Sequence, residues 1–355
     1  MINPIKAAVA LSIFFSLQIN AQFNVFEPTT SVGGYGELHY NYIKPERKES
    51  LKSLDFHRFV MFYSHAWNEQ WSFKAEVELE HNFVSEGEGE LELEQAYVDY
   101  RHSKEFGFQA GVILPSVGML NEIHEPPTFL SVERPDYNKN IIPTTWFGNG
   151  LSFYGSIEGF EYKMTVMEGL DASQFNAKSG IRDGRQKGFK ANAEDLLYNA
   201  RINYLSIPGL LFGASFTYNN ATKDSTNIAV SIAELHARYR ANNIYIDAEF
   251  GNISYSEGIV DNSRGFYFDL GYNVGALLKW ETEIIPFIRY SDYNTAAVTK
   301  IGGDSEKQYH VSQWMIGAAV KPIDEVIFKV DYSENEIELN KQMTSYFNFG
   351  VGYMF

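Results

Sequence analysis

The sequence predicts an all-β fold, a transmembrane barrel of sixteen antiparallel strands. Three observations lead to this prediction: a C-terminal segment with alternating side chains, fifteen further segments of the same kind, and connections of alternating length. From residue 345 to Phe355, odd-numbered positions are mostly aromatic or aliphatic, and even-numbered ones are mostly small or polar. Successive strand side chains point to opposite faces, so this segment has one face suited to lipid and one suited to water.

The N-terminus has the pattern of an export signal. Lys6 precedes an apolar run over residues 7–17, and Ala21 is a small residue at which a signal peptidase can cut. The run is shorter than the about 20 residues that a spanning helix needs. We therefore expect a cleaved signal peptide at 1–21 and one transmembrane β-barrel domain at 22–355.

Composition agrees with a barrel and excludes several classes of protein. Aromatic residues make up 15% of the chain, yet its mean hydropathy is only -0.26, as expected when a barrel hides a polar half in its lumen. The absence of cysteine excludes disulfides and thiolate metal sites. A net charge of -16 argues against nucleic acid as a partner.

Period-two alternation marks the strands in order, and their connections alternate between short turns and long polar loops. A soluble sandwich has no reason to alternate loop lengths, whereas a barrel of the Gram-negative outer membrane has periplasmic turns and extracellular loops. Both termini then lie at the periplasmic end. The candidate strands lie near residues 31–43, 53–67, 70–83, 91–102, 105–114, 149–157, 159–169, 196–206, 209–219, 228–240, 243–254, 264–275, 279–292, 310–320, 325–334 and 345–355.

Parity separates the two faces of most strands. In the third strand Phe73, Ala75 and Val77 alternate with Lys74, Glu76 and Glu78. A charge at the bilayer midplane costs about 2 to 4 kcal/mol for Lys or Arg, so the charged parity faces the lumen, which is wet. About sixteen strands leave an aqueous channel. Two stretches, 55–65 and 94–99, change phase, which indicates a bulge or a face covered by a neighbouring subunit.

The longest connection, 115–148, follows the fifth strand and is rich in apolar residues for an exposed loop. Folding into the pore would bury those residues and form a constriction; an outer cap or a subunit contact is the alternative. Candidate constriction or lumen residues are Glu122, Glu125, Glu133 and Arg134 of this loop, with Glu76, Glu78, Arg201, Arg238 and Arg240 of the wall.

Three motifs resemble the phosphate-selective porin O and P family. They are Leu91-Glu-Leu-Glu-Gln-Ala-Tyr-Val-Asp-Tyr, Phe108-Gln-Ala-Gly-Val-Ile-Leu-Pro-Ser-Val-Gly and the Glu-Arg-Pro of residues 133–135. The resemblance implies a sixteen-stranded, trimeric outer-membrane porin with its third extracellular loop folded into the channel. Anion-selective members line the pore with arginines and lysines. Here the inward parity holds twelve acids and seven bases, which favours a weak cation preference.

The arginines of the eighth and tenth strands allow two interpretations. Arg201, Arg238 and Arg240 could form a basic wall opposite acidic residues of the third loop, or they could pair with Glu234 and Asp247 and support the barrel. No close histidine pair, nucleotide-binding loop or catalytic triad is evident, so we expect no enzyme activity, no cofactor and no metal site.

The predicted function is therefore passive diffusion of small hydrophilic solutes or ions through a water-filled outer-membrane channel. The alternative is a channel specific for phosphate or another small anion, guided by the arginines above and by Arg182, Arg185, Lys187 and Lys190. A plugged adhesion barrel is a third possibility. Expected partners are outer-membrane lipid, the solutes, two further copies in a homotrimer, and the barrel-assembly machinery, for which Phe355 is the assembly signal.

Overall fold

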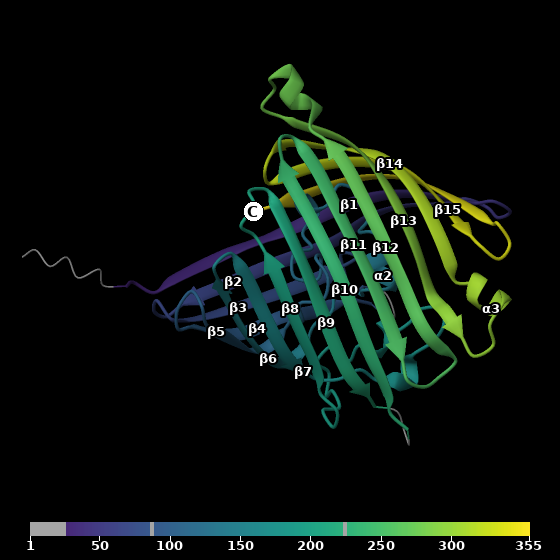
Figure 1. Ribbon diagram of the computed structural model, residues 1–355. Helices are drawn as coiled ribbons and strands as arrows, with labels where there is room; N and C mark the ends of the chain where they lie inside the picture. The colour runs from purple at the N-terminus through teal and green to yellow at the C-terminus, as the bar shows by residue number, and fades with distance from the viewer. Residues whose placement is uncertain (1–25, 86–88, 223–225) are drawn as a thin grey trace, which may run out of the picture.

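The computed structural model describes residues 26–85, 89–222 and 226–355, so the expected signal peptide lies outside the described residues. Within these ranges, sixteen strands form a closed antiparallel barrel (Figure 1). The predicted all-β fold, a closed barrel of sixteen antiparallel strands, is confirmed. The strands are β1 (Thr29–Pro45), β2 (Leu51–Ala66), β3 (Trp71–Glu80), β4 (Leu91–Arg101), β5 (Gly107–Ile113), β6 (Gly148–Ile157), β7 (Phe160–Met167), β8 (Leu197–Tyr204), β9 (Leu210–Ala221), β10 (Ile228–Ala241), β11 (Ile244–Tyr255), β12 (Val260–Tyr272), β13 (Glu283–Thr299), β14 (His310–Ile323), β15 (Val326–Ile337) and β16 (Met343–Met354).

The C-terminal strand closes the barrel, as its sequence predicts. β16 pairs with both β15 and β1, with Asn348 opposite Asn41 and Met354 opposite Tyr35. Phe355 continues the ladder, because its carbonyl accepts from Gly34 N (3.0 Å) and its own N–H donates to Gly34 O (2.9 Å). Every strand thus has two partners, which removes the unpaired edges that make open sheets aggregate.

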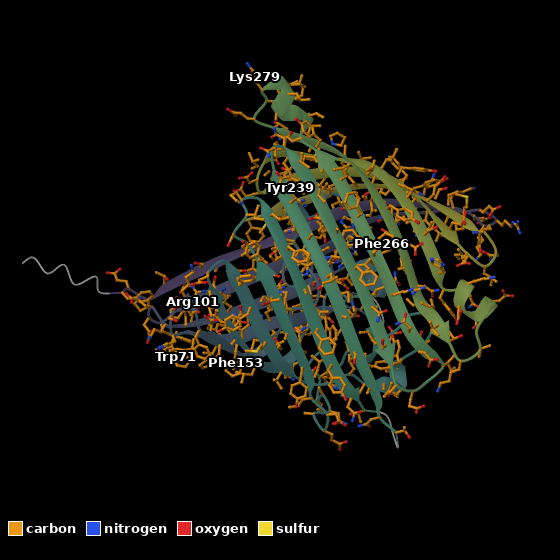
Figure 2. All side chains as sticks on the ribbon, viewed as in Figure 1. Trp71, Arg101, Phe153, Tyr239, Phe266 and Lys279 are labelled. Atoms are coloured by element: carbon orange, nitrogen blue, oxygen red, sulfur yellow. The ribbon has the colours of Figure 1, made fainter. Side chains whose placement is uncertain are left out.

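The expected parity is present along the wall. In β16, Phe347 and Phe349 are each 42% exposed on the outer face, whereas Asn348 between them is 4% exposed. Phe153, Tyr239 and Phe266 likewise lie on the outside of the barrel (Figure 2). Outward rings pair across strands, with centroids 4.6 Å apart for Trp71 and Tyr100 and 4.5 Å for Tyr290 and Trp314. Such pairs stabilise adjacent strands and suit a membrane boundary.

Two bulges explain the stretches that change phase. In β2 the pairing with β1 skips His57, so Asp55 faces His39 and Arg58 faces Glu37. In β4 the pairing with β3 skips Glu94, which is only 1% exposed. An extra residue rotates the following side chains onto the other face. The bulges therefore add charged groups to the interior at neighbouring strands.

The thirteenth strand was predicted too early in the chain. Residues 279–282, expected to begin it, instead continue the turn that follows the short helix η4 (Val274–Leu278), with Lys279 in the left-handed region at φ 57°. The Asn273 side chain accepts hydrogen bonds from Gly275 N and Ile284 N, which holds the chain in a turn until Glu283. β13 then runs to Thr299 and includes residues 293–299, which were expected in a loop.

The remaining short helices lie in connections between strands. They are η1 (Pro126–Thr128), α2 (Tyr137–Asn140), η2 (Ala172–Gln174), η3 (Arg182–Gly184) and α3 (Asp304–Lys307). None of the described helices is long and apolar enough to cross a bilayer. We call residues 114–147, between β5 and β6, loop 3, and residues 168–196, between β7 and β8, loop 4.

Candidate functional site

Loop 3 makes polar contacts with strands on one side of the barrel. Val132 N donates to Asp331 Oδ2 of β15 at 2.7 Å. Ser131 Oγ accepts from Arg289 Nη1 of β13 at 2.7 Å, while Nε and Nη2 of the same arginine donate to Asp269 at 2.6 Å each. Arg289 is 1% exposed. The ion pair with Asp269 fixes the guanidinium within the wall, and the hydrogen bond from a charged donor to Ser131 contributes about 1.5 to 3 kcal/mol to holding loop 3 there.

Apolar side chains also hold loop 3 against this side of the barrel wall. Leu130 is 3% exposed and belongs to one buried apolar cluster with residues of β13, β14 and β15, namely Ile285, Phe287, Met315, Ala319 and Ile327. Gly350 of β16 lets the loop approach the wall, because a Cβ there would lie 2.9 Å from Val132 Cγ1. A Cβ on Gly352 would likewise lie too close to the side chain of Pro126. The small residues of the C-terminal strand thus provide room for loop 3.

The beginning of loop 3 is bound to a different part of the wall. Glu122 lies 2.6 Å from Lys163 Nζ of β7 and 2.6 Å from Arg201 Nη2 of β8. Ser116 Oγ also donates to Glu122 at 2.7 Å. Burial disfavours the charged form, but Arg201 and Lys163 outweigh it and lower the Glu122 pKa to about 2. Loop 3 is therefore bound by charge pairs at one end and by Leu130 and Arg289 further along.

Acidic and basic side chains of β1 to β4 form a buried network beside the loop. Arg58 lies 2.7 Å from Glu37 and 3.2 Å from Glu78. His124 of loop 3 lies 3.6 Å from Glu76 and 3.4 Å from Glu94. Burial and the nearby Arg134 disfavour a proton on His124, but these two carboxylates raise its pKa to about 10. The imidazolium neutralises charge that the bulged Glu94 brings inside.

A cavity of about 650 Å³ lies between loop 3, loop 4 and the wall. We call it the channel cavity. Its charged lining mixes both signs: the acids are Glu37, Glu78, Glu80, Glu90, Glu92, Glu94, Glu133 and Asp136, and the bases are Arg58, Arg134, Lys139, Arg182, Arg185, Lys187 and Arg289. His39 and His57 also line it. A polar cavity of this size admits water and small solutes.

Some basic side chains of the channel cavity have a carboxylate partner, and others have none. Lys187 of loop 4 pairs with Glu90 at 2.7 Å and also with Glu92. Among the described residues, Arg134, Arg182 and Arg185 have no carboxylate within 4.0 Å. Arg185 donates instead to the carbonyls of Arg182 (3.0 Å) and Thr145. Burial and the adjacent Arg182 lower the Arg185 pKa to about 10.

The predicted site residues fall into three places. Glu78, Glu133 and Arg134 line the channel cavity. Glu76 and Glu122 line a second cavity of about 480 Å³ with Lys163. Glu125 precedes η1, and its Oε2 is buried without a hydrogen-bond partner among the described residues.

The three arginines proposed for a basic wall do not act together. Arg201 pairs with Glu122 of loop 3, as the first interpretation requires. Arg238 and Arg240 both pair with Asp247, at 2.8 Å for Arg238, as the second requires. Glu234 pairs with His236 instead. None of the three arginines lines the channel cavity.

Sequence reasoning missed His39, His57, Arg58 and the acidic run of β4 as cavity residues. The phase changes in β2 and β4 were the available signal, since each coincides with a bulge that turns charged groups inward.

A closed sixteen-stranded antiparallel barrel with an outward aromatic surface and a charged interior cavity defines a channel-forming porin of the outer membrane. The family model described as "Phosphate-selective porin O and P" matches residues 32–345. The chain belongs to this family, as the sequence motifs indicated.

Individual proteins extend the comparison. An uncharacterized protein of Aquifex aeolicus (strain VF5) is 32% identical over 350 residues, which cover 92% of this chain and 80% of the relative. An anion-selective porin from Comamonas acidovorans superimposes with a TM-score of 0.62 at 11% identity, over 93% of this chain and 100% of that one. The trimer form of OmpT from Vibrio cholerae has a TM-score of 0.60 at 12% identity, over 93% and 100%. These two structures share the fold.

Proposed function

We propose that the channel cavity is the constriction of this outer-membrane channel, and that small hydrophilic solutes or ions cross it by passive diffusion. The single observation that supports the constriction most strongly is that loop 3 contacts separate parts of the wall, through Glu122 on β7 and β8 and through Ser131 and Val132 on β13 and β15. A loop bound on both sides narrows the lumen. The cavity that remains is lined by charged groups, which suits hydrated solutes.

A second candidate, selectivity for phosphate or another small anion, is supported by the arginines of loops 3 and 4. Most acids of the channel cavity contact a cation or a histidine. By contrast, Arg134, Arg182 and Arg185 have no carboxylate partner among the described residues. Arg182 Nη1 and Arg134 Nε are also buried without a hydrogen-bond partner there. A small oxyanion would supply the missing charge and acceptors.

Reversal potentials in a salt gradient distinguish the two candidates. If the arginines guide anions, the double variant Arg182→Gln and Arg185→Gln shifts the reversal potential toward cation preference and weakens block by inorganic phosphate. Arg47→Gln is the matched control, because Arg47 lies in the first extracellular loop with its side chain 85% exposed. An unchanged reversal potential and unchanged phosphate block in the double variant would reject anion guidance and leave unselective diffusion.

We also propose a homotrimer, a cleaved signal peptide at 1–21, and recognition of Phe355 by the barrel-assembly machinery. The trimer is supported by the fold shared with the trimer form of OmpT. Cross-linking of the protein in native membranes tests it, with a ladder ending at three subunits as the expected result. The proposal assigns the chain transport without catalysis, which agrees with its family.

A further inference from the structure

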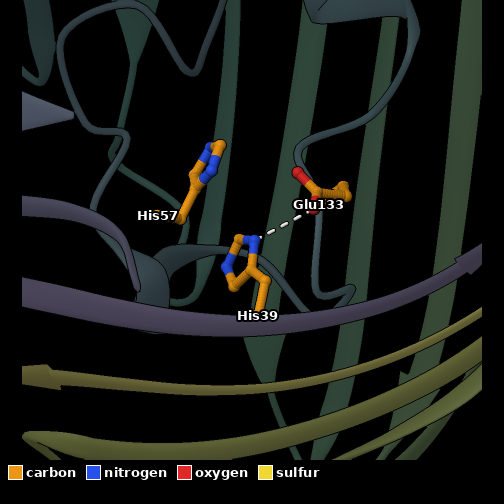
Figure 3. A group of neighbouring side chains, drawn as sticks. All are labelled: His39, His57 and Glu133. Carbon is orange, nitrogen blue, oxygen red and sulfur yellow. Dashed lines mark hydrogen bonds and ion pairs between the residues drawn. The ribbon is translucent and has the colours of Figure 1, made fainter. Parts of the chain in front are cut away.

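Two imidazoles and a carboxylate converge at the wall of the channel cavity (Figure 3). His39 is an inward residue of β1, His57 is the bulged residue of β2, and Glu133 belongs to loop 3. One ligand atom of each lies within 4.8 Å of the other two. Nδ1 of His39 is 2.9 Å from Glu133 Oε1, and the two imidazoles stack with centroids 4.7 Å apart.

Outer carboxylates hold both imidazoles in place. Glu37 Oε2 lies 3.1 Å from Nε2 of His39, and Arg58 fixes the other oxygen of Glu37 at 2.7 Å. This contact directs Nδ1 of His39 toward Glu133. Asp55 lies 3.2 Å from Nδ1 of His57, and among the described residues the remaining nitrogen, Nε2, has no hydrogen-bond partner. Carboxylates that orient histidine ligands from behind are a regular feature of metal sites.

We propose that His39, His57 and Glu133 bind a divalent transition-metal ion of the Zn²⁺ class inside the channel. Two neutral imidazoles with one carboxylate are ligands that Zn²⁺ prefers, whereas Mg²⁺ and Ca²⁺ take oxygen ligands. A tetrahedral ion with bonds of about 2.0 Å separates its ligand atoms by about 3.3 Å. The present 2.9 Å between His39 Nδ1 and Glu133 Oε1 widens slightly, the ion replaces the shared proton, and the stacked rings turn toward one point.

The site has a route of access and one open position. All three ligands line the channel cavity, and the Glu133 side chain is 43% exposed. A second group, Asp55, His57 and His81, shares His57 and also gathers its ligand atoms within 4.8 Å. His81 follows β3 at the end where the long loops lie, so this group is nearer the extracellular mouth. Water or a passing anion fills the fourth position of the bound ion.

Binding would also change the channel. His39 belongs to the wall and Glu133 to loop 3, so the ion joins the loop to β1 and adds positive charge to the cavity. This consequence rests on the proposed channel function, whereas binding itself does not.

The test is calorimetric titration of ZnCl₂ into the purified full-length mature protein in detergent, after removal of metal with EDTA. We expect one equivalent of Zn²⁺ with micromolar or tighter affinity. His39→Gln and Glu133→Gln should each weaken binding by about tenfold or more, since even an outer partner of a metal ligand is worth 10- to 100-fold. His65→Gln on β2 lies outside both groups and is the matched control. Co²⁺ in place of Zn²⁺ should give the visible absorption of a tetrahedral site.

Three results would overturn the proposal: no saturable binding by the wild type, equal affinity in His39→Gln and in the control, or loss of binding in His81→Gln with retention in His39→Gln. Single-channel recording then tests the metal site and the channel function independently. Zn²⁺ should reduce the conductance of the wild type, EDTA should restore it, and His39→Gln should be insensitive. Zn²⁺ binding in a protein that conducts no ions would support the metal site and reject the channel function.

Discussion

Replacement of Leu130 by alanine tests whether loop 3 is held against the barrel wall. Leu130 is 3% exposed and belongs to a buried apolar cluster formed with residues of three strands, β13, β14 and β15. Removal of a leucine side chain from such a site costs about 2 to 5 kcal/mol, because transfer energy is lost and a cavity remains. A loss of about 3 kcal/mol raises the population of the displaced loop by about 100-fold, since 1.4 kcal/mol is a factor of ten.

Single-channel recording measures the consequence. Leu130→Ala should show noisier open-channel current and more frequent steps to a larger conductance, and limited proteolysis should cut loop 3 faster. Leu235→Ala is the matched control, because Leu235 lies on the outer face of β10 and is 50% exposed. If Leu130→Ala and Leu235→Ala have the same noise, conductance and proteolysis rate, the packing of Leu130 against the wall does not position loop 3.

Three further predictions concern the contacts of loop 3 and the C-terminus of the chain. Gly350→Val should lower the unfolding temperature and raise conductance noise, because its Cβ would lie 2.9 Å from Val132 Cγ1; an unchanged protein would show that the loop does not need this space. Arg201 and Lys163 lower the Glu122 pKa from 4.5 to about 2, so its stabilisation is present above pH 4.5 and is lost as the pH falls toward 2. Melting curves of wild type and Glu122→Gln should therefore differ most above pH 4.5, and a constant difference down to pH 2 would contradict this. Deletion of Phe355, whose ring stacks on Phe59 with centroids 5.8 Å apart, should reduce the amount of protein in outer-membrane fractions, while the channels that do insert conduct normally.

Parity and loop length were sufficient to predict the barrel, because the alternation within each strand indicates by itself which residues face lipid. The alternation of Phe347 and Phe349 with Asn348 needs no knowledge of the neighbouring strands. The start of β13 could not be predicted in the same way. Lys279 belongs to an alternating pattern, but the side-chain hydrogen bonds of Asn273 keep that segment in a turn.

The channel cavity was harder to predict, because its composition depends on register and on loop packing. His39 and His57 are too far apart in the sequence to be recognised as a pair of metal ligands. The bulge in β2 brings their rings together. Arg238 and Arg240 have the right parity for a pore lining, yet their pairing with Asp247 of the adjacent strand engages both. Spacing in the sequence does not indicate which inward charges remain free.

Conductance of the purified mature protein in a planar lipid bilayer shows whether the barrel is an open, water-filled pore. We expect discrete steps of ion current, each from insertion of one assembly of water-filled barrels. A folded, inserted barrel that gives no current steps would contradict this expectation, because the loops would then close the lumen instead of narrowing it.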